Sequence, residues 1–305
     1  MKKYSSLVFV LILIGSMFSC KSDQKKVSKE EYIKSVKEWQ ETRLERLKSE
    51  NGWLNLVGLH WLEEGENPFG SNEANNIVFP EKAPEFIGSF MLYKSHLSVR
   101  IEPDVEVYIN DSLAKEHEVY PDAAKNTTYF RLGDFRWHII QRGDRYGIRL
   151  RDLKSPLLEK ITEIPSFPID QKWRVKAVFE TFDSPKEIAV PNFLGDVNYE
   201  KCYGLLKFKI QGKELSLMPL GDGINENFFV IFADETSAEE TYGAGRFLSV
   251  EKPDKKGITY IDFNKATNPP CAFTDYATCP LPPRENILPV KILAGEKTNE
   301  LIGHH

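Results

Sequence analysis

The sequence contains few of the residues that build metal sites or nucleic-acid surfaces. Its 305 residues include four cysteines, and no two of these have zinc-finger spacing. Lys and Arg number 40 against 45 Asp and Glu, which gives a net charge of −5. A general nucleic-acid binder needs a basic face, and this balance does not favour one. We therefore predict no metal, no cofactor and no nucleic-acid partner.

The sequence also lacks the short motifs that identify common enzymes. It has no Gly-x-Ser-x-Gly elbow, no Walker loop, no dinucleotide fingerprint and no His-Glu-x-x-His, and its six histidines are scattered. Aromatic residues are plentiful, with 19 Phe, 12 Tyr and 5 Trp. Such a chain has enough apolar surface to bury a sizeable core, which excludes a disordered acidic protein.

The N-terminus has the pattern of an export signal. Lys2 and Lys3 precede an apolar run at residues 7–14, which is shorter than the roughly 20 residues that span a bilayer. The run leads to Met-Phe-Ser-Cys, an ending typical of a lipobox, with Cys20 as the lipidated residue. We predict that residues 1–19 are removed as a signal peptide, which changes the net charge from −5 to −7. The alternative is an ordinary signal peptide with an incidental cysteine.

This pattern predicts an exported lipoprotein of the bacterial cell envelope, attached to the membrane through its N-terminal lipid. Residues 20–27 are polar and are interpreted as a lipidated tether. A helix is then expected within residues 28–51. Ser28 and Glu31 have the spacing of a capping box, apolar residues follow at helical intervals, and Asn51-Gly52 is a stop signal.

A first β unit is predicted over residues 52–155. Apolar residues alternate through 97–109, and turn residues stand at Asn110-Asp111 and Gly143-Asp144. Several short, closely spaced strands are typical of a sandwich or small barrel. The run from Trp53 to Asp152 is similar to forkhead-associated domains in its short strands and early turn. That resemblance implies no phosphopeptide site, because the family's binding residues have no counterparts that we can place here.

A second β unit is predicted over residues 171–299, after a proline-containing linker at 156–170. Residues 173–179 and 206–210 alternate between apolar and polar, as in half-buried strands. Residues 228–232 are apolar on both faces, which indicates a central strand, and 290–293 are expected to form the last strand. The predicted fold is mainly β, with two β-sandwich or barrel-like units preceded by one N-terminal α-helix.

The C-terminal part carries a long signature. Its segments are Gly-Arg-Phe-Leu at 245–248, Asp-Phe-Asn at 262–264, Asn-Pro-Pro-Cys-Ala-Phe-Thr at 268–274, Tyr-Ala-Thr-Cys-Pro-Leu-Pro-Pro at 276–283 and Ala-Gly-Glu-Lys at 294–297. This signature resembles an uncharacterised bacterial family, domain of unknown function 1684. The segments Gly-Trp-Leu at 52–54, Trp-Leu at 61–62 and Arg-Leu-Arg-Asp at 149–152 look like the same family. The resemblance covers nearly the whole mature chain and implies no reaction.

Polar residues of the signature form the candidate site. Asp262 and Asn264 are two apart and share a strand face, while Arg246 is the single charged residue of another strand. In one interpretation Arg246 pairs with Asp262 in a structural network; in the other it holds an anionic or sugar-like ligand. We expect six residues to converge at one end of the second unit: Arg246, Asp262, Asn264, Asn268, Tyr276 and Asn286.

Three functions are therefore considered. The favoured one is the binding of a small polar or anionic ligand in the C-terminal β unit. The alternatives are a hydrolase-like envelope enzyme that uses the Arg/Asp/Asn cluster and a structural accessory protein of the envelope. We also predict a disulfide between Cys271 and Cys279, because they are eight residues apart in an exported chain. Cys202 is left as the odd, buried cysteine.

Overall fold

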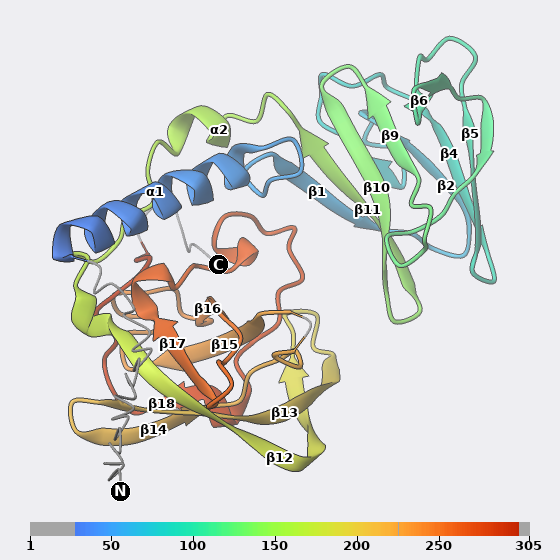
Figure 1. Cartoon of the computed structure of the whole chain (residues 1–305). Helices are drawn as coiled ribbons and strands as arrows, with labels where there is room; N and C mark the ends of the chain where they lie inside the picture. The colour runs from blue at the N-terminus through green and yellow to red at the C-terminus, as the bar shows by residue number, and fades with distance from the viewer. Residues whose placement is uncertain (1–27, 225, 299–305) are drawn as a thin grey trace, which may run out of the picture.

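The protein folds into two β units, and one long helix that precedes both lies along the C-terminal unit (Figure 1). The structure is a computed structural model that describes residues 28–224 and 226–298. The predicted signal peptide, tether and Cys20 lie outside the described residues. The fold class is confirmed, since the described part of the chain is mainly β and its first element is an α-helix. No described helix combines the length and apolarity that crossing a membrane requires.

The helix α1 (Lys29–Lys48) begins with the predicted capping box. The Ser28 hydroxyl accepts from the Glu31 amide, and the Glu31 carboxylate accepts from the Ser28 amide. These two bonds satisfy backbone donors that a helix start leaves free. Tyr32, Val36 and Leu47 are buried along one side of the helix. α1 therefore packs lengthwise on the C-terminal unit and directs its last turn toward the first unit (Figure 1).

The first unit is a sandwich of two sheets. One sheet has the order β3-β2-β4-β5-β8 and the other β1-β11-β10-β9-β6-β7. Its strands are β1 (Leu56–Trp61), β2 (Gly65–Gly70), β3 (Ile77–Val78), β4 (Gly88–Tyr93), β5 (His96–Ile101), β6 (Tyr108–Ile109), β7 (Ser112–Leu113), β8 (Glu116–Glu118), β9 (Tyr129–Leu132), β10 (Phe135–Arg142) and β11 (Arg145–Asp152).

The core of the first unit is aromatic. The rings of Phe130 and Trp137 stack with centroids 5.3 Å apart, and Phe69, Phe79 and Phe90 pack around them. Contacts of this kind add to the apolar area that the sheets bury against each other. One face of the β1-β11-β10-β9 sheet is thereby committed to the core. Its other face is left to build the candidate site.

The C-terminal unit contains a four-stranded sheet, β14-β13-β12-β17, and a three-stranded sheet, β16-β15-β18. The predicted strand at 228–232 is confirmed as central, because β15 pairs with β16 on one side and β18 on the other. The strands are β12 (Arg174–Pro191), β13 (Val197–Ile210), β14 (Lys213–Leu217), β15 (Phe228–Asp234), β16 (Arg246–Val250), β17 (Ile258–Asp262) and β18 (Ile287–Leu288).

Two segments differ from the sequence prediction. The expected last strand at 290–293 is wrong, since the strand pairing occurs earlier, at β18. The physical reason is that the carbonyl groups of Ile292 and Ala294 accept hydrogen bonds from Arg246 instead of from a neighbouring strand. The linker at 156–170 contains a short helix, α2 (Leu157–Lys160).

Candidate functional site

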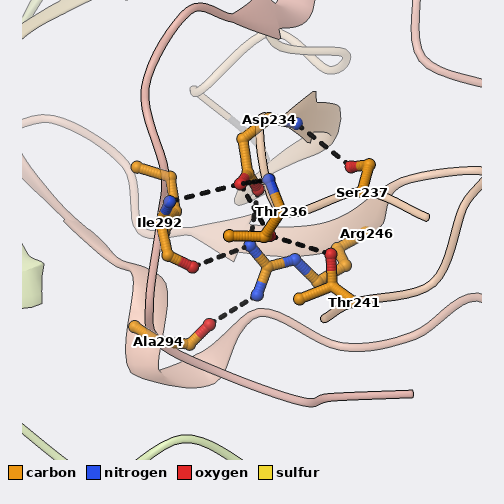
Figure 2. Close-up of polar contacts among 7 residues, drawn as sticks. All are labelled: Asp234, Thr236, Ser237, Thr241, Arg246, Ile292 and Ala294. Atoms are coloured by element: carbon orange, nitrogen blue, oxygen red, sulfur yellow. Dashed lines mark hydrogen bonds and ion pairs between the residues drawn. The ribbon is translucent and has the colours of Figure 1, made fainter. Parts of the chain in front are cut away.

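Arg246 is fully buried, and both of its Nη atoms donate to the protein, whereas its Nε has no hydrogen-bond partner among the described residues. Its Nη2 lies 2.6 Å from Asp234 Oδ2 and 3.2 Å from the Ile292 carbonyl, and its Nη1 donates to the Ala294 carbonyl (Figure 2). Burial lowers the pKa of Arg246, and the charge of Asp234 opposes that shift. The predicted pairing with Asp262 is wrong. Arg246 stands opposite Phe232 in the sheet register, so its diagonal neighbour two residues along β15 is Asp234.

Asp234 is satisfied by a local turn. Its Oδ1 accepts from the backbone and hydroxyl of Thr236, at 2.8 and 2.7 Å, and from the Ile292 amide at 3.2 Å (Figure 2). The Thr236 and Thr241 hydroxyls are 2.9 Å apart. A buried ion pair is stable only when its remaining donors and acceptors are used in this way. The Arg246 cluster therefore holds the 290–294 segment against β15 and β16, which is a structural task.

Asp262 and Asn264 dock the N-terminal helix. The Tyr32 hydroxyl donates to Asp262 Oδ1 at 2.8 Å, and Asn264 Nδ2 donates to the Tyr32 oxygen at 2.8 Å. Asp262 also caps the 3-10 helix η2 (Phe263–Lys265) through the Asn264 amide. Asn264 Oδ1 accepts from the Asp170 amide at 3.1 Å. The strand face that Asp262 and Asn264 were predicted to share is thus the surface against which α1 packs.

The three remaining candidates occupy separate places. Asn286 donates to the carbonyls of Met218 and Ile231 and accepts from the Met218 amide. The Asn268 amide donates to Glu296 at 2.6 Å, and Tyr276 is 37% exposed. Within the described residues, hydrogen bonds join only two of the six candidates directly, Asp262 and Asn264. Five of the six therefore serve local structure, Tyr276 is exposed, and within the described residues the six do not share one network of polar contacts.

The structure has Cys271 and Cys279 as free thiols, so the predicted disulfide is absent from it. The Cys271 amide donates to the Cys279 sulfur at 3.1 Å, within the turn that begins the 3-10 helix η3 (Pro270–Ala272). A hydrogen bond from the Cys279 thiol, ahead of one from the Tyr242 hydroxyl, lowers the pKa of Cys271. The two sulfurs therefore meet as hydrogen-bonded neighbours. Cys202 is buried and free, as expected for the odd cysteine.

A different set of charged residues stands out on the sheet face that the first unit does not bury in its own core. We call it the arginine face. Residues on this face alternate along neighbouring strands: Arg131 on β9, Arg136, His138 and Arg142 on β10, and Arg145, Arg149 and Arg151 on β11. Alternation with buried Trp137, Ile148 and Leu150 puts them all on one side of the sheet.

The four outer arginines have carboxylate partners. The nearest nitrogen–oxygen distances are 3.7 Å for Arg131–Asp111, 2.8 Å for Arg136–Glu50, 2.9 Å for Arg142–Asp122 and 2.5 Å for Arg145–Asp196. Each of these carboxylates lies next to a partly exposed guanidinium, where solvent already screens the charge. These four carboxylates are therefore already paired with the arginines at the rim of the arginine face.

The two central arginines are buried. Arg151 is 6% exposed, and its Nη1 donates to the Gly52 carbonyl and to Asn55 Oδ1. Arg149 is 8% exposed and forms no hydrogen bond or ion pair with any residue that the structure describes. Its guanidinium lies 5.2 Å from the Trp53 ring centroid. Burial, then the charges of Arg142 and Arg151, lower the pKa of Arg149 to about 10. Arg149 is thus a buried cation whose strongest charged neighbours, Arg142 and Arg151, are also cations.

Local sequence explains how this centre is built. Trp53 follows α1 directly, and both Arg149 and Arg151 stack over its ring. Gly147 leaves room for Trp61, because a Cβ there would lie 2.9 Å from the Trp61 ring. The C-terminal unit also reaches this region, since the Thr274 hydroxyl donates to the Leu56 carbonyl at 3.2 Å. The arginine face therefore lies where the two units meet.

This arrangement suits the binding of an anion. A guanidinium presents its donors in a planar fork that matches the oxygens of carboxylate, phosphate or sulfate. Burying an unpaired charge costs several kcal/mol of free energy. A counter-ion bound at Arg149 would offset much of that cost. Sequence reasoning noted the 149–152 segment only as part of the resemblance. The available signal was two arginines, Arg149 and Arg151, that alternate with the apolar residues Ile148 and Leu150.

The fold and these contacts define a mainly β protein of two units with a buried cationic centre between them. Residues 159–297 match the family model described as Protein of unknown function (DUF1684), and this part of the chain belongs to that family. None of the curated proteins matches the chain.

Several solved structures are similar to parts of the chain. An uncharacterized protein from gene locus rrnAC0354 of Haloarcula marismortui is 27% identical, with a TM-score of 0.39 over 48% of this chain and 80% of that chain. An FHA domain studied for phosphothreonine-dependent interactions is 13% identical, with a TM-score of 0.22 over 30% of this chain and 92% of that one. The FHA domain of FhaA has the same identity and TM-score and is covered over 97% of its length.

Proposed function

We propose that this protein binds a small oxyanion at Arg149. The observation that carries the proposal is a guanidinium that is 8% exposed and has no hydrogen-bond or ion-pair partner among the described residues. The ligand class agrees with the sequence-based expectation of an anionic ligand. The site moves from the C-terminal β unit to the arginine face of the first unit, at its contact with the C-terminal unit.

The distribution of carboxylates supports this proposal. Asp122 accepts from Arg142 and from the Gln141 amide, and Glu50 accepts from Arg136, so each is already paired. The charge of Asp122 raises the pKa of Arg149, but less than Arg142 and Arg151 lower it. Trp53 offers a ring face, which stabilises a cation by about 0.5–2 kcal/mol. That is less than the several kcal/mol that burying an unpaired charge costs. An anion from outside the chain supplies the remaining stabilisation.

The test is the binding of sulfate and inorganic phosphate to the folded protein, measured by calorimetry at low ionic strength. We expect a dissociation constant below about 1 mM for at least one of them. Arg149→Met is expected to weaken binding by roughly tenfold or more, since a hydrogen bond to a charged group contributes about 1.5–3 kcal/mol.

Arg131→Met is the matched control. It removes the same charge from the same face, but Arg131 is partly exposed and is paired with Asp111. We expect its affinity for the anion to stay within about twofold of the unmutated protein, because an exposed pair contributes little. Equal loss in both variants would mean that only the overall charge of the face matters. No binding of either anion would refute the proposal.

We also propose that the protein works as an exported lipoprotein anchored in the cell envelope through Cys20. The support is the N-terminal pattern of two lysines, a short apolar run and the Met-Phe-Ser-Cys ending. The membrane is then its partner through the lipid, and the oxyanion is a molecule of the envelope or its surroundings.

A further inference from the structure

We propose that anion binding at Arg149 is coupled to protonation of His138, so that the protein takes up a proton with the anion and binds it more tightly as the pH falls. This inference rests on the proposed function and adds the regulation of the same site. It also specifies the ligand: a centre that gains a second positive charge favours a dianion, such as a sulfate or phosphate group, over a carboxylate.

The geometry places the two side chains next to each other. His138 on β10 is directly opposite Arg149 on β11 in the antiparallel register, and the Cβ atoms of such pairs are about 5 Å apart. On the other side, the ring of Tyr129 lies 5.5 Å from the His138 ring. His138 is partly buried in the middle of the arginine face, so no wide layer of solvent separates it from Arg149.

The charges that face His138 are mostly positive. They are Arg149 and Arg151 from β11 and Arg142 from its own strand, opposed by Asp122 from the loop before β9. Asp122 is already shared, because it lies 2.9 Å from Arg142. The other titratable neighbour is Tyr129, whose ring packs against the imidazole from β9. The neutral imidazole is therefore strongly preferred in the anion-free protein.

The direction of the pKa agrees with this geometry. Burial first, and then the charges of Arg149 and Arg151, lower the pKa of His138 to about 4. A dianion on Arg149 would remove the repulsion and add an attraction, so the pKa of His138 would rise toward its ordinary value. By linkage, the same coupling acts on the anion. If the pKa returns to about 6.5, affinity rises roughly tenfold between about pH 7.5 and pH 5.5.

Sulfate is the appropriate probe, because it remains a dianion throughout this range and any pH dependence then belongs to the protein. Calorimetry measures sulfate affinity at about pH 7.5 and about pH 5.5, and NMR follows the His138 imidazole signal during a pH titration with and without saturating sulfate. The signal is assigned by its loss in His138→Gln. We expect roughly tenfold tighter binding at the lower pH and a His138 pKa that rises from about 4 to about 6.5 when sulfate is bound.

Two variants make the test specific. His138→Gln should bind sulfate with nearly the same affinity at both pH values. His60→Gln should keep the pH dependence, because His60 is another partly buried histidine of this sheet whose pKa is lowered by burial alone. In anion-free Arg149→Met, the pKa of His138 should already lie higher than in the unmutated protein.

The outcomes separate the two proposals. Absence of both sulfate and phosphate binding at both pH values overturns the proposed function and the coupling together. Binding with equal affinity at both pH values and an unmoved His138 signal overturns the coupling alone. An unchanged His138 pKa in Arg149→Met would show that the two side chains do not sense each other, which also overturns the coupling.

Discussion

Two buried arginines in this protein have opposite surroundings. Arg246 has a carboxylate at 2.6 Å and two carbonyl acceptors, so all the charge that it buries is compensated. Arg149 has an indole ring and two neighbouring guanidinium groups. The Nε of both arginines lacks an acceptor, so the difference lies in the Nη atoms, which are paired in Arg246. The sequence pattern drew attention to the first arginine. The hydrogen bonds of Arg246 indicate a role in folding, and the lack of such bonds at Arg149 is the basis of the proposed anion site.

The two arginines should therefore respond oppositely to the same substitution. Arg246→Met leaves Asp234 buried without its cation, which is expected to reduce the free energy of unfolding by about 3–5 kcal/mol. Arg149→Met orphans no carboxylate and relieves a buried charge, so its free energy of unfolding should equal or exceed that of the unmutated protein. Urea denaturation measures both. A loss in Arg149→Met as large as that in Arg246→Met would show that Arg149 supports the fold.

At the scale of elements, α1 is held to the C-terminal unit by polar contacts at two positions along its length. Tyr32 reaches Asp262 near the start of the helix, and Arg43 reaches Glu296 at 3.1 Å and the Asn268 carbonyl at 3.0 Å near its end. Burial raises the pKa of Glu296, and Arg43 opposes that shift. The capping box determines where α1 begins, and these contacts determine where it lies.

Tyr32→Phe tests that attachment. It removes the donor to Asp262 and the acceptor for Asn264, so we expect the free energy of unfolding to fall by roughly 1–3 kcal/mol. Tyr120→Phe is the control, because Tyr120 also donates to a carboxylate, that of Glu118, but at an exposed site. Its effect should be within about 0.5 kcal/mol. Equal stability of the two variants in thermal denaturation would contradict the docking role of Tyr32.

The positions of the helix and strands were largely predictable from the sequence, but the contacts between neighbouring strands and helices were not. Ser28 and Glu31 predicted the start of α1, and the apolar run at 228–232 predicted the centre of a sheet, because both signals are local. The partner of Arg246 was missed, since register between β15 and β16 depends on packing across the whole unit. The surroundings of Arg149 were missed for the same reason, because its neighbours come from β10, β11, the segment that contains Trp53 and the loop that contains Asp122.

At the scale of the whole molecule, the candidate site lies where the parts of the chain meet. α1 rests on the C-terminal unit, and the residues that follow it supply Trp53 to Arg149 and the Gly52 carbonyl to Arg151. The loop at 271–279 approaches from the other unit through Thr274. Arg145 and Asp196 form an ion pair between the units at 2.5 Å. A change in the relative position of the two units would therefore alter the surroundings of Arg149.

The location of the whole molecule is the last prediction. The N-terminal pattern predicts cleavage before Cys20 and acylation of its sulfur, since a charged start, a short apolar run and a cysteine ending are read by the export machinery as one signal. Protein produced in a bacterial host should partition into detergent, and its intact mass should show a chain that begins at Cys20 and carries acyl groups. Cys20→Ser should lose both properties, whereas Cys202→Ser, at a buried cysteine of β13, should keep them. A mature chain that begins elsewhere, or one that begins at Cys20 without acyl mass, would refute the lipoprotein proposal and would leave the binding of the oxyanion at Arg149 to be judged on its own test.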